Sequence, residues 1–156
     1  MVKTRRFEGV ELDETDTRLI EALSENGRTS LADLGRLVGM SPQSAAERVR
    51  RLEDLGVISG VSVILDPAAL GLGIAAYIRI QPALGEVKRV AKLVAEIPEI
   101  VECDRVTGDD CFIAKVFVSR VEELERVIDI LLPYARTNTS IVQSTPVPRR
   151  QPRYSR

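Results

Sequence analysis

Histidine and tryptophan are absent from the 156-residue sequence, and cysteine, tyrosine and phenylalanine are scarce, with two, three and three residues. Without histidine, the chain lacks the commonest metal ligand and the usual acid–base group of neutral pH. Two cysteines are too few for a zinc site or a disulfide framework, and so few aromatic rings disfavour a stacking platform for single-stranded nucleic acid. We therefore predict no metal site, no cofactor and no catalytic residues.

Long apolar runs are also missing. No stretch approaches the ~18 apolar residues of a membrane helix, and no apolar run follows the first six residues, as it would in a signal peptide. We expect a cytoplasmic protein that makes no membrane contact. At 44% hydrophobic and 29% charged residues, the composition is that of a folded globular protein.

The net charge of −1 says little about partners, because 22 basic and 23 acidic residues nearly cancel. Local clusters of positive charge are more informative, since a near-neutral protein can bind nucleic acid through one basic surface. Such clusters occur at Arg48, Arg50 and Arg51 and in a basic tail, residues 149–156, with Arg149, Arg150, Arg153 and Arg156.

Residues 1–58 predict three short helices, each with apolar residues recurring at helical spacing. The first covers residues 13–25, and the last two are separated by only three residues. Capping residues mark each beginning, and glycine or asparagine marks each end. The start signals are Asp13 or Thr15, Ser30, and Ser41-Pro42, and the stop signals are Asn26-Gly27, Gly39 and Gly56.

Residues 59–73 predict a strand-like linker, because residues 61–65 alternate with period two before Asp66-Pro67 breaks the pattern. Residues 74–148 then predict the order βαββαβ, which is the ferredoxin-like arrangement of an antiparallel sheet with both helices on one face. The fold class is therefore α+β. The expected strands are 74–81, 100–106, 111–118 and 138–145, and the expected helices are 85–96 and 122–132.

The third helix of the head has the chemistry of a DNA-reading helix. Ala45, Val49 and Leu52 would face inward, leaving a polar outer face that fits a major groove about 12 Å wide. Glutamine suits adenine, arginine suits guanine or phosphate, and the helix N-terminus attracts phosphate. We predict a helix-turn-helix of the winged type in which these side chains are free, the alternative being a plain helical bundle with a charged surface. The candidate DNA-binding residues are Ser41, Gln43, Ser44, Glu47, Arg48, Arg50 and Arg51.

Motifs along residues 12–148 closely resemble the Lrp/AsnC family of bacterial and archaeal transcriptional regulators. The resemblance implies a double-stranded DNA partner, a βαββαβ domain for effector binding and assembly, and an amino acid or related molecule as effector. It also implies homodimers that assemble further, commonly to tetramers of dimers. The motifs are Leu12-Asp13-x-x-Asp16-x-x-Leu19-Ile20, Gly27-Arg28-x-Ser30, Ser41-Pro42, Arg48-Val49-x-Arg51-Leu52-Glu53-x-x-Gly56-Val57-Ile58, Asp66-Pro67, Leu70-Gly71, Val106-Thr107-Gly108 and Thr139-Ser140-Ile141-Val142.

The loop after Gly108 departs from the family pattern Gly-x-x-Asp-(Tyr/Phe), because Cys111 stands at the acidic position. Asp109 and Asp110 still offer carboxylates for an ammonium group, while nearby hydroxyls and backbone N–H groups suit a carboxylate. The alternative is a solvated hairpin turn in which glycine and aspartate merely suit the backbone. The candidate effector-binding residues are Thr107, Gly108, Asp109, Asp110, Thr137, Thr139 and Ser140.

The leading hypothesis is thus a sequence-specific, homo-oligomeric transcriptional regulator. One alternative is a ferredoxin-like small-ligand-binding protein or enzyme that uses its helical head for assembly. That alternative requires apolar residues on the outer face of residues 43–51, where the sequence has glutamine, serine, glutamate and three arginines. A second alternative, a nucleoid-organising protein, differs only in its specificity ratio between sites.

Overall fold

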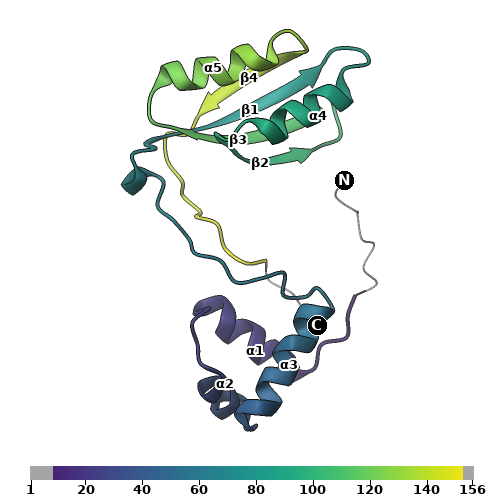
Figure 1. The fold of residues 1–156 in the computed structure, drawn as a ribbon, viewed down its shortest axis with the longest axis vertical. Coiled ribbons are helices and arrows are strands. Elements are labelled where there is room, and N and C mark those ends of the chain that lie inside the picture. Colours follow the sequence, from purple (N-terminus) through teal and green to yellow (C-terminus); the bar gives the residue numbers. More distant parts are fainter. Residues whose placement is uncertain (1–8, 153–156) are drawn as a thin grey trace. The chain divides into compact units, whose positions relative to one another are not determined.

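The computed structural model describes residues 9–152. The chain forms two compact units, of which the first contains the described residues through Ile64 and the second spans Leu65–Arg149. Figure 1 shows three helices in the first unit and a sheet with two long helices in the second. Each unit is considered by itself. No helix in the described ranges has the length and apolar character needed to cross a bilayer.

The first unit, the head, consists of α1 (Glu14–Glu25), α2 (Leu31–Val38) and α3 (Pro42–Asp54). The sequence signals for their ends are confirmed. Asp13 caps α1 in a capping box with Asp16, and Ser30 and Ser41 accept hydrogen bonds from the first turns of α2 and α3. Gly39 ends α2 in the left-handed conformation, at φ 72°.

The three helices enclose a small core in which Leu19, Leu34 and Ala45 are fully or almost fully buried. Gly35 of α2 faces the turn that leads into α3, and a Cβ atom there would lie 2.7 Å from the carbonyl oxygen of Met40. Because only glycine permits this approach, the turn packs directly on α2. The helix-turn-helix geometry therefore depends on a small residue inside α2 as well as on the caps.

The described part of the head contains no strand, so the expectation of a winged helix-turn-helix is wrong. The linker differs as well. Its period-two segment forms no sheet in this chain, and one short 3-10 turn, η1 (Ala68–Leu70), follows Pro67. A strand needs a neighbour for its N–H and C=O groups, and residues 57–66 pair with no described strand. Val61, Val63, Ile64 and Leu65 remain exposed.

The second unit confirms the βαββαβ order. Its sheet has the strand order β2-β3-β1-β4 with antiparallel neighbours throughout, and both helices cover one face (Figure 1). Alternate residues of β1 and β3 pack against these helices around the fully buried Ile78, Ile80 and Val116. The elements are β1 (Ile74–Pro82), α4 (Val87–Glu96), β2 (Ile100–Arg105), β3 (Phe112–Val118), α5 (Val121–Leu131) and β4 (Ala135–Ile141).

The last strand lies earlier in the chain than the expected residues 138–145. Ala135 pairs with Pro82 and Ile141 with Ala76, so the register uses the partner strand almost to its start. After Val142 donates to the carbonyl of Ala75, β1 offers few further partners. The tail that follows is described only through residue 152, and Arg153 and Arg156 of the basic tail lie outside the described residues.

A candidate DNA-binding helix and effector loop

The outer face of α3 carries polar side chains over a buried inner face. Gln43, Glu47 and Arg50 are exposed, whereas Ala45 and Leu52 are fully buried. The amide of Gln43 lies 3.4 Å from the carboxylate of Glu47 one turn later. Arg50 makes no ion pair or hydrogen bond with the described residues. These three side chains are therefore free to meet a ligand at the surface.

The N-terminus of α3 is organised by two serines. The hydroxyl of Ser41 accepts the N–H of Ser44 at 3.1 Å, and the two hydroxyls lie 2.9 Å apart. Pro42 occupies the first helical position, where a missing N–H costs nothing. The remaining N–H groups of the first turn and the positive end of the helix dipole make this end suited to a phosphate.

Arg48 and Arg51, predicted to be free, are bound within the head, which corrects that expectation. The guanidinium of Arg48 contacts Asp16 at 2.9 Å and also Asp13, and Arg51 contacts the second oxygen of Asp16 at 3.2 Å. Asp16 is 1% exposed. A buried carboxylate is costly unless it is paired and hydrogen-bonded, and the two arginines provide that compensation.

This Asp16 cluster, defined as Asp13, Asp16, Arg48 and Arg51, joins the start of α1 to the middle of α3. The N–H of Asp16 and the nearby Arg48 hold the pKa of the Asp13 carboxyl below its ordinary value. The carboxylates of Asp13 and Asp16 raise the pKa of Arg48 in turn. The cluster therefore stabilises the orientation of the candidate reading helix, and the sequence offered no local sign of it.

The candidate effector loop joins β2 to β3, where Gly108 has φ 112°, a conformation that favours glycine. Asp110 lies 3.9 Å from Arg79 on the neighbouring strand β1. Arg79 in turn donates to Asn138 of β4 at 2.7 Å. Sequence reasoning missed Arg79 and Asn138, because only the strand register places them beside the loop.

The hydroxyl residues expected to complete this site do not lie together. Thr137 and Thr139 pair with the buried Ile80 and Ile78, so their side chains point to the helix-covered face. Ser140 lies on the opposite, open face, three residues or roughly 10 Å along the strand from Thr137. Of the predicted effector residues, the structure therefore groups those of the loop, residues 107–110, and separates the three on β4.

Two family models match the chain. The model described as an AsnC-type helix-turn-helix domain covers residues 12–53, and the Lrp/AsnC ligand binding domain covers residues 75–152. The HTH-type transcriptional regulator YezC of Bacillus subtilis is 37% identical over 134 residues, which are 86% of this chain and 95% of that protein.

Solved structures of related proteins agree. The structure of LrpC from B. subtilis has a TM-score of 0.82 and 32% identity, covering 87% of this chain and 97% of that one. The feast or famine regulatory protein of M. tuberculosis, complexed with L-methionine, has a TM-score of 0.84 and 29% identity, covering 90% and 98%. The chain belongs to the Lrp/AsnC family and is a DNA-binding transcriptional regulator, not an enzyme.

Proposed function

We propose that α3 enters the major groove of duplex DNA and reads sequence there, which places the protein's action in the cytoplasm. The observation that carries this is the free polar face of Gln43, Glu47 and Arg50 on a helix whose other face is buried. An arginine can bond guanine bidentately, and a glutamine adenine. Ser41 and Ser44 at the helix start position it against a phosphate. Arg48 and Arg51 serve mainly to hold the helix, with their exposed portions near the DNA backbone.

Binding of the full chain to duplex DNA at a series of salt concentrations tests this proposal. A protein that replaces counterions at phosphates loses affinity steeply as salt rises, about ten-fold or more between 50 and 200 mM for several contacts. We expect such a loss on a duplex selected from a random pool. An affinity independent of salt would contradict insertion of α3 into a groove.

We further propose that the second unit holds the protein as a homodimer, with higher assemblies such as a tetramer of dimers built from the same unit. The open face of the sheet exposes Tyr77, and the linker exposes Val63 and Ile64, the latter almost completely. Apolar surface of this kind is typical of an interface, and a linker strand without a partner in its own chain is suited to pairing with a second copy.

A fragment lacking residues 1–60 tests the dimer. It keeps the exposed linker residues and the complete second unit, which has its own core. We expect sedimentation equilibrium to show at least a dimer at the same concentrations as the full chain. A monomeric fragment beside an oligomeric full chain would assign assembly to the head instead.

For the effector, we propose that a small amino acid binds at the loop of residues 107–110. Asp109 and Asp110 match its ammonium group, while Arg79, Thr107 and the backbone of Gly108 match its carboxylate. The row from Asp110 through Arg79 to Asn138 supports this, because it sets charges of both signs on one edge of the site. The methionine complex of the M. tuberculosis relative supports the ligand class.

Calorimetry of the full chain with the twenty amino acids tests this site. For any amino acid that binds there, Asp110→Asn should weaken the affinity about ten-fold, since charge-assisted hydrogen bonds are among the strong ones. Glu102→Gln, an exposed acid on β2, is the matched control and should change nothing. Binding that survives both Asp110→Asn and Asp109→Asn unchanged would place the effector elsewhere.

A further inference from the structure

A second hollow lies at the other end of the sheet, with a volume of about 480 Å³. It is formed by the turn after the linker, by the segments that begin β2 and end β3, and by the first turns of α5. All of its lining residues belong to the second unit. The volume falls within the roughly 300–1,000 Å³ of pockets that hold small molecules.

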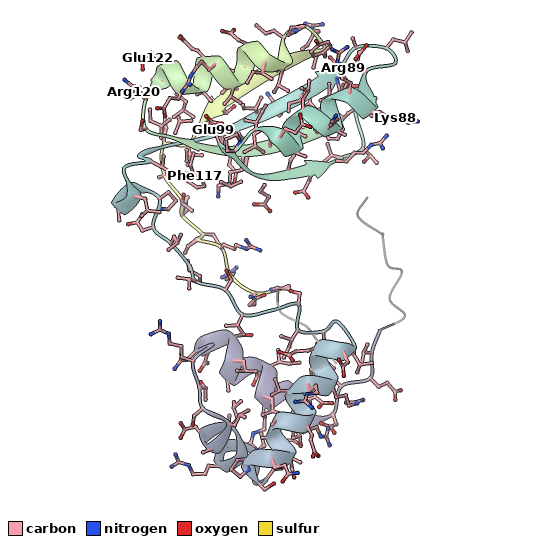
Figure 2. The ribbon with its side chains drawn as sticks, in the orientation of Figure 1. Lys88, Arg89, Glu99, Phe117, Arg120 and Glu122 are labelled. Carbon is pink, nitrogen blue, oxygen red and sulfur yellow. The ribbon has the colours of Figure 1, made fainter. Side chains whose placement is uncertain are left out.

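This pocket is separate from the effector loop. Phe117, in its wall, lies five residues along β3 from Phe112, which begins the strand beside the loop. Five residues of an extended strand span roughly 17 Å. Figure 2 shows Phe117 and Glu99 close together at this end of the sheet, and the N–H of Phe117 donates to the carbonyl of Glu99 at 3.1 Å.

The interior of the pocket is apolar, formed mainly by Leu70, Leu72, Val101 and Phe117. The first three are partly or largely exposed in the chain as it stands. Covering such surfaces with an apolar group removes them from water, which is favourable by about 25 cal/mol per Å². The pocket therefore offers binding energy to a ligand with an aliphatic or aromatic side chain.

Two charged groups of opposite sign lie at the pocket and are not committed elsewhere. The carboxylate of Glu99 is half-buried and makes no hydrogen bond or ion pair within residues 9–152. Arg126 is 68% exposed, and its ion pair with Glu123 is stretched to 4.0 Å. Glu123 itself is satisfied, because it accepts the N–H and the hydroxyl of Ser119 at 2.9 Å, which lower its pKa.

An unpaired acid, an available guanidinium and an apolar interior match the three parts of an apolar amino acid. We propose that this pocket is a second amino-acid site, in which Glu99 receives the ammonium, Arg126 the carboxylate, and Leu70, Leu72 and Phe117 the side chain. The proposal extends the proposed function, in which an amino acid is the effector. A bound ligand would also fix the turn at residues 65–72, through which the head is attached to the sheet.

The ligand class follows from the charges. A fatty acid or other apolar anion would bring a second negative charge beside Glu99 in a half-buried place, which is unfavourable. An apolar amine would satisfy Glu99 but leave Arg126 unused. Only a ligand with both charges beside an apolar side chain uses every group described, so leucine, methionine and phenylalanine are the natural probes.

Calorimetry with these three amino acids, on the full chain, tests the pocket through four variants. Glu99→Gln and Arg126→Gln alter it, Asp110→Asn alters the loop, and Glu122→Gln is the matched control, an exposed acid on α5 outside the pocket (Figure 2). We expect one of the three to bind at a site that Glu99→Gln and Arg126→Gln each weaken about ten-fold. Asp110→Asn and Glu122→Gln should leave this site intact.

Analogues of leucine separate the parts of the ligand. Against the parent chain, 4-methylpentanoate, which lacks the ammonium, should bind at least ten-fold more weakly than leucine, and Glu99→Gln should abolish that difference. The amine 3-methylbutylamine should behave likewise with Arg126→Gln. Equal binding of leucine and both analogues would overturn the assignment of charges and with it the proposal.

Two other outcomes are distinguishable. Binding that only Asp110→Asn weakens would overturn the second site and leave the effector loop standing. No binding of any of the three amino acids, together with a Leu72→Asp variant that sediments as a smaller species than the parent, would assign the apolar surface to a second copy of the chain and overturn the proposal.

Discussion

Alanine in place of Arg48 is expected to destabilise the head by about 1.5–3 kcal/mol, the usual cost of losing a hydrogen bond to a charged group. The change removes the shorter of the two guanidinium contacts with the buried carboxylate of Asp16. Arg51 remains and limits the loss. Removing Arg51 as well leaves Asp16 buried with only the N–H of Asp13, and the cost should approach about 3–5 kcal/mol.

Hydrogen exchange of amides in α1 and α3 is the suitable measurement, because it reports the opening of the head separately from that of the second unit. Arg50→Ala is the matched control. It removes the same side chain one turn away, but from a position with no partner among the described residues, and should change exchange by no more than about 0.5 kcal/mol. Equal effects of Arg48→Ala and Arg50→Ala would show that the Asp16 cluster does not stabilise the head.

The second large effect concerns DNA. Arg50→Ala should lower the affinity for a selected duplex by about 1–3 kcal/mol, while the head stays folded. Because Arg50 is exposed and unpaired within the head, its loss reports the interface alone, whereas loss of Arg48 mixes binding with stability. If Arg50 reads a base, the loss is confined to one position of the site, and if it contacts phosphate, all sequences weaken alike.

Binding assays on variant duplexes measure this effect at fixed salt. Arg120→Ala, an exposed arginine of the second unit, is the charge-matched control and should bind as tightly as the parent. An Arg50→Ala protein that binds every duplex as the parent does would remove this side chain from the interface and leave the outer face of α3 without its main cation.

The parts of the structure that the sequence predicts are those set by neighbouring residues. Helix starts follow from side chains that bond N–H groups two or three positions later, as Ser30 and Ser41 do, and a glycine such as Gly39 marks an end through its own backbone. The βαββαβ order follows in the same way from alternation and helical spacing. Such interactions are legible in a short window of residues.

The features that the sequence did not reveal join residues far apart. Asp16 and Arg48 are separated by 32 positions, and nothing local distinguishes Arg48 from the other basic residues that might pair with Asp16. The faces taken by Thr137 and Ser140 depend on the register between β4 and β1, where a shift of one residue exchanges the two faces. The pairing of Arg79 with Asp110 depends on the same register.

The linker illustrates a third kind of difference. Its period-two pattern indicates extended backbone, but a strand also needs a neighbour, and the chain supplies none among the described residues. The pattern in Val61 and Val63 therefore specifies a conformation without specifying the partner. A second copy of the chain, as proposed above, would supply that partner.

Photo-cross-linking to duplex DNA tests most directly the claim that α3 reads DNA. The photoreactive residue p-benzoylphenylalanine is placed at position 47, on the outer face of α3, or at position 122, on the exposed surface of α5. We predict covalent attachment to the selected duplex from position 47 and none from position 122, at equal occupancy of the DNA. Attachment from position 122 with none from position 47 would contradict the account.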